Sequence, residues 1–152
     1  MLRRLLALAG SAMILLALPA GMASAAESVI IRQSTPFESF GPLTCTGENW
    51  RVSGTIETLT HIVTQADGSV TETVQVRVFS EVVNATTGAT YPSIHTSTTN
   101  TVQGADGSFA FTLIITTVVP RLSISTIELR SVTHADGTFS SPVQNFKTLC
   151  LG

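Results

Sequence analysis

Three copies of the tripeptide Ala-Asp-Gly, at residues 66–68, 105–107 and 135–137, constrain the fold of this chain more than any other feature. A calcium-binding loop needs several carboxylates close together, whereas each triplet supplies one Asp and the chain has no other Asp residues. A three-residue hairpin loop needs two residues with right-handed turn angles and then a Gly, which accepts a positive φ angle. The triplets therefore predict three hairpin turns, formed by Asp67 and Gly68, Asp106 and Gly107, and Asp136 and Gly137.

The composition predicts strands on both sides of these turns. Residues 27–152 contain 23 Thr, 14 Val and 9 Ile, so more than a third of them are β-branched. A three-residue loop at the first triplet pairs Ile56 with Val78 and Val52 with Val82. This pairing gathers apolar residues on one face of the hairpin and polar residues on the other. A shift of one residue would mix the two sets, which a half-buried sheet disfavours.

The same counting assigns the side chains of the other two hairpins to faces. In the second hairpin, the face expected to be the interior combines five apolar residues with four polar ones: Phe109, Phe111, Leu113, Ile115 and Val119 with Tyr91, His95, Ser97 and Thr99. In the third hairpin, two sets are expected on opposite faces: Phe139, Val143 and Leu149 on one, and Phe146 and Cys150 on the other. Pro142 is expected at a bulge or on an edge strand.

These hairpins predict an all-β fold, an antiparallel up-and-down meander of six to eight strands. The hairpins are expected at residues 49–83, 90–119 and 122–149, with one further short strand at residues 28–33. Closure as a small β-barrel is expected because it removes exposed strand edges. A two-sheet β-sandwich is the alternative. Residues 27–44 then form an N-terminal segment, and residues 45–152 form a single β domain.

The N-terminus predicts export. Arg3 and Arg4 precede an apolar stretch, and the small residues at 23–25 form a cleavage site, so residues 1–26 are interpreted as a removed signal peptide. The expected location is secreted, extracellular or periplasmic, without stable membrane insertion after cleavage. Cys45 does not follow a lipoprotein-type cleavage sequence, which argues against a lipid anchor there.

Cysteine content and charge narrow the classes of partner. Cys45 and Cys150 lie near the two ends of the exported chain, and in an oxidising compartment such a pair predicts one disulfide, with two separate thiols as the alternative. Without Arg3 and Arg4, six basic residues face ten acidic ones, a net charge of −4. No basic patch exists to bind a phosphate backbone, so nucleic acid is a poor candidate partner.

The sequence gives no sign of catalysis, of a metal site or of a cofactor. His61, His95 and His134 have no metal-ligand spacing, and no free cysteine is left to join them. No Ser lies in a nucleophile-elbow motif, and a catalytic triad would have to take its Asp from an exposed hairpin tip. The chain is therefore interpreted as a protein that is not an enzyme, although a barrel interior can hide a single catalytic Glu or Tyr.

Binding is the function that the pattern favours. Tyr91 and His95 are polar-tipped rings on the face expected to be the interior, and together with Trp50 they are the candidate ligand-binding residues. The alternative is that all three are core residues. The expected partner is a small apolar ligand in the barrel or an extracellular protein at the surface. A structural or adhesive module is the other class considered, and an enzyme of unknown type is the third. Asn84, in the connector 84–89, matches a glycosylation acceptor.

Several short motifs resemble a family of small secreted bacterial β-sheet proteins of uncharacterised function. The matching residues are Cys45-Thr46-Gly47-Glu48, Gly54-Thr55, His61, the Gly88 to Tyr91 segment, the last Asp-Gly hairpin and Cys150. The resemblance would cover most of residues 45–150. It implies an exported β-sheet domain, and it supplies no activity and no catalytic residues. The segment "TLIITTVVPRL" departs from the family pattern, so a shared pocket does not follow.

Overall fold

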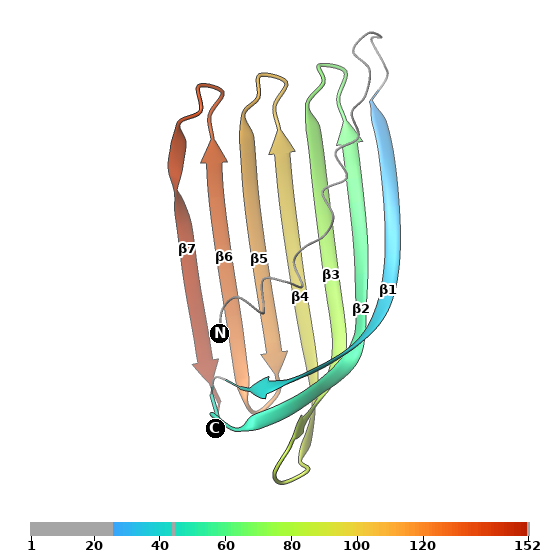
Figure 1. The fold of residues 1–152 in the computed structure, drawn as a ribbon, viewed down its shortest axis with the longest axis vertical. Helices are drawn as coiled ribbons and strands as arrows, with labels where there is room; N and C mark the ends of the chain where they lie inside the picture. The colour runs from blue at the N-terminus through green and yellow to red at the C-terminus, as the bar shows by residue number, and fades with distance from the viewer. Residues whose placement is uncertain (1–25, 44, 152) are drawn as a thin grey trace.

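The computed structural model describes residues 26–43 and 45–151. This part of the chain forms seven antiparallel strands in one sheet, in sequence order, and contains no helix (Figure 1). The strands are β1 (Glu27–Pro42), β2 (Asn49–Thr64), β3 (Val70–Asn84), β4 (Thr90–Gln103), β5 (Phe109–Val119), β6 (Ser123–Thr133) and β7 (Phe139–Cys150). The predicted all-β antiparallel meander is confirmed. The predicted signal peptide, residues 1–26, lies outside the described residues except for Ala26.

Each Ala-Asp-Gly triplet forms the loop of a hairpin, and the three loops lie at one end of the sheet (Figure 1). The glycine at the third position has a φ angle of 80–85° in all three loops. Its N–H donates to the carbonyl of the residue three positions earlier, as in Gly68 to Gln65 at 3.0 Å. The preceding Asp accepts a hydrogen bond from the N–H two residues later, as Asp67 does from Ser69 at 2.9 Å. These carboxylates therefore stabilise turns.

The strand register agrees with the hairpin counting. Val52 pairs with Val82 and Ile56 with Val78. Successive side chains alternate between faces, so the even-numbered residues of β2 and β3 share one face with the odd-numbered residues of β1, β4, β5 and β6. We call this the inner face and the opposite one the outer face. All five buried hydrophobic residues found in the described part of the chain lie on the inner face: Trp50, Val74, Val78, Val82 and Val119.

The sheet is strongly curled at the end opposite the three loops. Trp50 on β2 and Val119 on β5 belong to one buried cluster with Val82, although three strand spacings, about 14 Å, would separate them in a flat sheet. The start of β2 and the end of β1 sweep across the inner face towards β7 (Figure 1). The Cys45–Cys150 disulfide joins the β1–β2 loop to the end of β7 there. We call this region the closed end.

Gly54 permits the bend of β2 towards the closed end. A β-carbon at this position would overlap the carbonyl of Phe79 and lie 2.7 Å from the α-carbon of Ser80, both on the neighbouring strand. No side chain fits between backbones that close. The glycine is therefore required where β2 leaves the plane of the sheet.

Two expectations about the first strand and about closure differ from the structure. The short strand expected at residues 28–33 is a 16-residue strand that continues through Pro36 to Pro42. An edge strand tolerates proline because an amide on its outer side has no partner to lose. Within the described residues, β1 pairs only with β2 and β7 only with β6, so the sheet is open and a closed barrel is not shown. The single sheet also leaves the sandwich alternative unsupported.

The third hairpin contains one wrong assignment of a face. Phe139 was expected to share a face with Val143, but it pairs with Thr133 and lies on the inner face, whereas Val143 pairs with Arg130 on the outer face. The register shifts between Arg130 and Val132, opposite Pro142. The extra residue in β7 moves every side chain before it to the other face.

Candidate functional site

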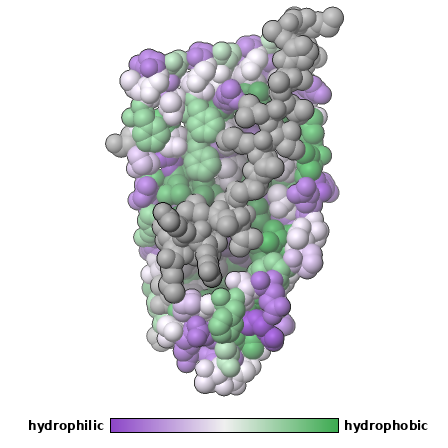
Figure 2. All heavy atoms as spheres, viewed as in Figure 1, coloured by the Kyte–Doolittle hydropathy of each residue, from purple (hydrophilic) through white to green (hydrophobic). Residues whose placement is uncertain are grey.

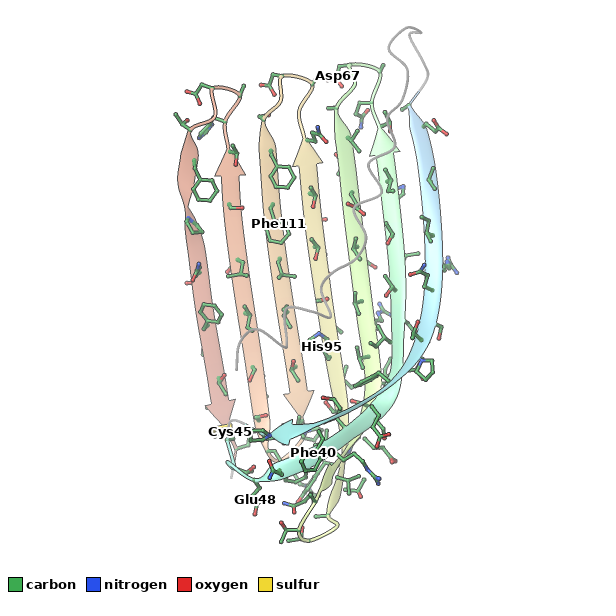
Figure 3. All side chains as sticks on the ribbon, in the orientation of Figure 1. Phe40, Cys45, Glu48, Asp67, His95 and Phe111 are labelled. Carbon is green, nitrogen blue, oxygen red and sulfur yellow. A yellow bond between two sulfur atoms is a disulfide. The ribbon has the colours of Figure 1, made fainter. Side chains whose placement is uncertain are left out.

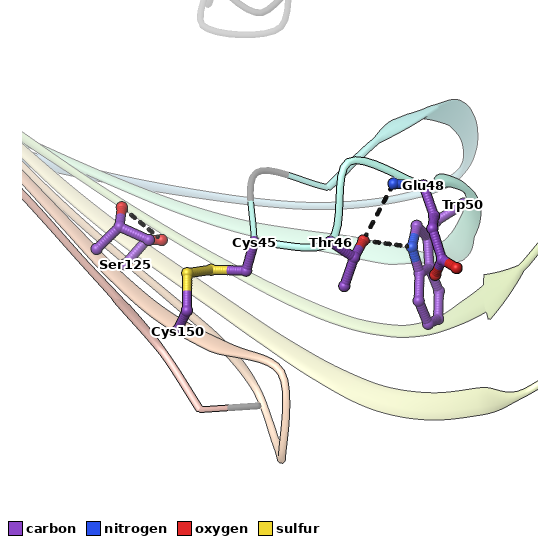
Figure 4. The surroundings of a disulfide bond; sticks show 7 residues. Cys45, Thr46, Glu48, Trp50, Ser125 and Cys150 are labelled. Atoms are coloured by element: carbon purple, nitrogen blue, oxygen red, sulfur yellow. Dashed lines mark hydrogen bonds between the residues drawn. A yellow bond between two sulfur atoms is a disulfide. The ribbon is translucent and has the colours of Figure 1, made fainter.

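Trp50 forms part of the core and is not accessible to a ligand. Its side chain is 2% exposed, and its indole N–H donates to Thr46 Oγ1 at 3.0 Å (Figure 4). Tyr91 packs against it, with ring centroids 5.8 Å apart and tilted by 54°. Two of the three predicted ligand-binding residues therefore seal the closed end from within. For Trp50, the structure favours the alternative interpretation as a core residue.

A polar network holds the loops of the closed end together. The disulfide has an S–S distance of 2.04 Å and joins residues 105 positions apart (Figure 4). Asn84 donates from its amide to Glu48 at 2.5 Å and accepts hydrogen bonds from the N–H groups of Thr86 and Thr87. Asn84 was expected in an exposed connector, but it is only 3% exposed. Both the nitrogen and the oxygen of its amide therefore take part in hydrogen bonds within the closed end.

His95 lies on the inner face of β4, beyond the closed end and next to the open part of the sheet (Figure 3). It is half-buried between Val78 on β3 and Thr117 on β5. Its Nδ1 lies 2.9 Å from Thr117 Oγ1. Burial disfavours the imidazolium and lowers the pKa of His95 below its ordinary value of 6.5. His95 is therefore a neutral hydrogen-bonding group at neutral pH.

This burial predicts a pH dependence of stability. As the pH falls through about 6.5, the unfolded chain takes up a proton that folded His95 resists, so the free energy of unfolding decreases. Above that pH the contribution of His95 is constant. We expect His95→Gln, which keeps a hydrogen-bonding side chain, to flatten the decline between about pH 7.5 and pH 5.5 in urea unfolding. An unchanged slope in the variant would show that His95 titrates normally.

The three turn carboxylates act in a separate pH range. The pKa values of Asp67, Asp106 and Asp136 lie below the ordinary value of 3.8 because each carboxylate accepts hydrogen bonds from the Ser or Thr two residues later. Their contribution is present above pH 3.8 and is lost only in stronger acid. The pH dependence of the free energy of unfolding that we assign to His95 is therefore measured without interference from these three carboxylates.

The inner face beyond His95 is apolar along β5 and the strands that follow it. Four successive inner positions of β5 are apolar: Phe109, Phe111, Leu113 and Ile115. They pair on β6 with residues that include Leu129 and Ile127, and Ile127 in turn pairs with Phe146 of β7. Figures 2 and 3 show this apolar area on the face turned towards the viewer, including Phe111.

Sequence reasoning did not place β6 and β7 in this apolar area. The alternation in β6 is interrupted by inner-facing serines, and the bulge at Pro142 breaks the period of β7. On β4, the strand that pairs with β5, the inner positions beside this apolar row instead carry Ser97, Thr99 and Thr101. A strip of small polar side chains thus lies beside a row of large apolar ones, with His95 at the end of the strip.

The outer face has its own apolar row, which crosses five strands. Phe79 pairs with Ile94, Ile94 with Val118, Val118 with Ile124, and Ile124 with Leu149. The exposed fractions of Phe79, Ile94 and Leu149 are 54%, 47% and 53%. A solvent-facing apolar row of this length favours contact with another surface.

A shallow hollow of about 200 Å³ lies on the outer face across β1, β2 and β3. Its lining includes His61, which the sequence placed on the solvent face and whose Nε2 lies 2.8 Å from Ser28 Oγ. His134 is near Ser140 at the far end of the sheet, with 3.0 Å between Nε2 and Oγ. The three histidines are thus on separate parts of the molecule.

Within residues 26–43 and 45–151, no group of three His, Cys, Asp or Glu side chains is arranged to hold a metal ion. The same residues contain no helix that is long and apolar enough to cross a membrane. The disulfide is consistent with an oxidising compartment outside the cytoplasm. No protein-family model, curated protein or solved structure matches this chain. The resemblance to secreted bacterial β-sheet proteins stays a prediction.

Proposed function

We propose that this protein is a non-catalytic binding protein of an extracytoplasmic compartment, and that it takes an elongated apolar ligand along the inner face. The observation that carries the proposal is the apolar row Phe109, Phe111, Leu113 and Ile115 on the inner face of an open sheet. Within residues 26–43 and 45–151, the single curled sheet has no second layer over this row. A bound apolar chain would supply that cover and would gain the free energy of removing both surfaces from water.

The chemistry near the closed end supports an amphipathic ligand with an uncharged polar group. Neutral His95 and the hydroxyl of Thr117 form a polar pair at one end of the strip on β4. A hydroxyl, ester or amide group can hydrogen-bond to such a pair, whereas a carboxylate would meet no positive charge there. In this proposal Trp50 and Tyr91 close the end of the site, and the ligand enters along the open side of the sheet. Closure of the sheet as a barrel is not needed.

Adjacent residues on β5 provide a matched test. Leu113 faces inward and Ile114 outward, and threonine at either position is a β-branched residue that suits a strand. We expect Leu113→Thr to weaken binding of a fluorescent long-chain acyl alcohol by about 10-fold, the effect of losing one to two kcal/mol of apolar contact. Ile114→Thr should leave the affinity unchanged.

Native mass spectrometry of the protein from its natural compartment would supply the ligand itself. A reproducible added mass that denaturation removes supports the proposal. Equal effects of the two threonine variants, together with a native mass equal to that of the bare chain, would contradict it.

A second candidate function is docking of a protein partner on the outer face, as in a structural or adhesive module. The outer row from Phe79 to Leu149 favours it. Ile94→Lys places a charge within that row, between Phe79 and Val118, and leaves the inner face unaltered. Loss of partner capture in this variant, with acyl-alcohol binding intact, would identify the outer face as the functional one.

A further inference from the structure

Among the described residues the sheet has two free edges, and the number of strands determines how these edges can pair with each other. Seven strands alternate in direction, so β1 and β7 run in the same direction. Pairing β1 with β7 inside one chain would join them as a parallel seam in an otherwise antiparallel sheet. An antiparallel partner for either edge must therefore come from another molecule.

The two edges differ in how well they are protected against pairing. β1 carries Glu27, Arg32 and Glu38 as well as two prolines, and charges and prolines are the usual means of blocking an edge. β7 after Pro142 has one charge, Lys147, and three exposed apolar side chains: Val143, Phe146 and Leu149. Phe146 is 65% exposed. The segment 143–149 is thus the less protected edge.

The backbone of β7 offers free groups at alternate residues. The N–H of Leu151 donates to the carbonyl of Leu122 at 3.0 Å, just beyond the last strand pair. Hydrogen-bonded pairs alternate along an antiparallel ladder, so the odd-numbered residues 143–149 direct their backbone groups to β6. Gln144, Phe146 and Thr148 therefore direct theirs away from the sheet, where they can pair with another strand.

We propose that two copies of this chain pair through β7 as a twofold symmetric, antiparallel dimer centred on Phe146. In this register Phe146 lies opposite the partner's Phe146, and Val143 lies opposite the partner's Leu149. Lys147 lies opposite the partner's Asn145, so no like charges meet. The backbone groups that hydrogen-bond between the two copies are those of Phe146 with the partner's Phe146, and those of Gln144 with the partner's Thr148. Isologous pairing of this kind is the commonest symmetry of protein dimers.

Other registers are less favourable. A twofold axis at Lys147 would place two lysines face to face, and an axis at Asn145 would place Lys147 against the partner's Val143. A shift to an odd offset would pair outward-directed groups with groups already bonded to β6. Pro142 lies at the end of the segment and stops the pairing there, because it has no N–H to donate.

The dimer would join the two sheets edge to edge with their inner faces on the same side. Phe146 is on the inner face, opposite Ile127, so the two Phe146 rings would extend the apolar area across the seam. The dimer thus buries exposed aromatic surface that the monomer leaves in water.

The test is the molar mass of the full exported chain, with its disulfide intact, measured by sedimentation over a dilution series. We expect a monomer–dimer equilibrium in the wild type. Phe146→Lys places two ammonium groups at the symmetry axis and should raise the dimer dissociation constant by about 100-fold. The matched control is Ile30→Lys on the other edge, where the side chain is 60% exposed, and it should leave the constant unchanged.

A second variant separates edge pairing from side-chain effects. Gln144→Pro removes an outward-directed N–H without removing a bond to β6, so it should weaken the dimer and leave the unfolding transition of the monomer unchanged. In the wild-type dimer, hydrogen exchange of the backbone amide at position 146 should be slowed, and in both β7 variants the exchange at this position should be fast. A wild type that is monomeric at every concentration would overturn the proposal. So would a dimer that Ile30→Lys dissociates and Phe146→Lys does not.

Discussion

Removing the disulfide with Cys45→Ser and Cys150→Ser is expected to lower the free energy of unfolding by about 4–5 kcal/mol. The bond joins residues 105 positions apart, so it restricts the unfolded chain strongly. It also fastens the β1–β2 loop to β7 at the closed end, where the sheet has no other covalent constraint. Urea unfolding of the double variant and of the wild type in oxidising buffer measures the difference.

Reduction of the wild type provides the control for this prediction. Cys150 is exposed, so a thiol reductant can reach the bond in the folded protein. The reduced wild type and the double variant should unfold at the same urea concentration, well below the oxidised protein. If the oxidised protein and the double variant unfold together, the closed end is held by packing and hydrogen bonds without help from the disulfide.

Replacing Trp50 with alanine is expected to cost about 3–5 kcal/mol. Trp50 is 2% exposed and is the largest side chain of a buried cluster that otherwise contains two valines. The variant leaves a cavity and removes the donor to Thr46 Oγ1. Trp50→Phe keeps most of the packing and should cost much less. The measurement is urea unfolding with a common slope for all variants.

Phe40→Ala is the matched control, since Phe40 is an aromatic residue near the closed end that is 65% exposed (Figure 3). This variant should change the free energy of unfolding by less than about 0.5 kcal/mol. Similar losses for Trp50→Ala and Phe40→Ala would contradict the small buried cluster as the main source of stability at this end. Acyl-alcohol binding by Trp50→Phe should equal that of the wild type, because Trp50 does not contact the ligand in the proposed site.

The two apolar areas of the molecule account for the functions proposed for it. Exposed apolar residues are common singly, but on the outer face they form a row that follows strand pairing. On the inner face, a row of half-buried apolar residues follows β5. The inner row has a polar group at one end and suits a ligand, whereas the outer row is uniform and suits a surface. The edge of β7 is a third feature, to which we assign dimer formation. The variants that test it, Phe146→Lys and Gln144→Pro, leave the two rows largely intact.

Local chemistry in the sequence determined the hairpins, the register and the disulfide pair. Ala-Asp-Gly at the loops specifies the pairing of β2 with β3 and of β4 with β5, because a loop of fixed length leaves one register. Pairing in turn determines which residues share a face, so the inner position of His95 followed from the sequence. Only two cysteines are present, and their bond followed as well.

Only the tertiary structure decided how the sheet is shaped and which candidate residues are accessible. Alternation does not specify curvature, so nothing in the sequence brought Trp50 on β2 against Val119 on β5. Proline at position 36 looked like the end of a strand, yet an edge strand accepts it, and β1 continues to Pro42. The bulge at Pro142 reversed the face of Phe139. These outcomes depend on contacts between segments far apart in the chain, which a local pattern does not encode.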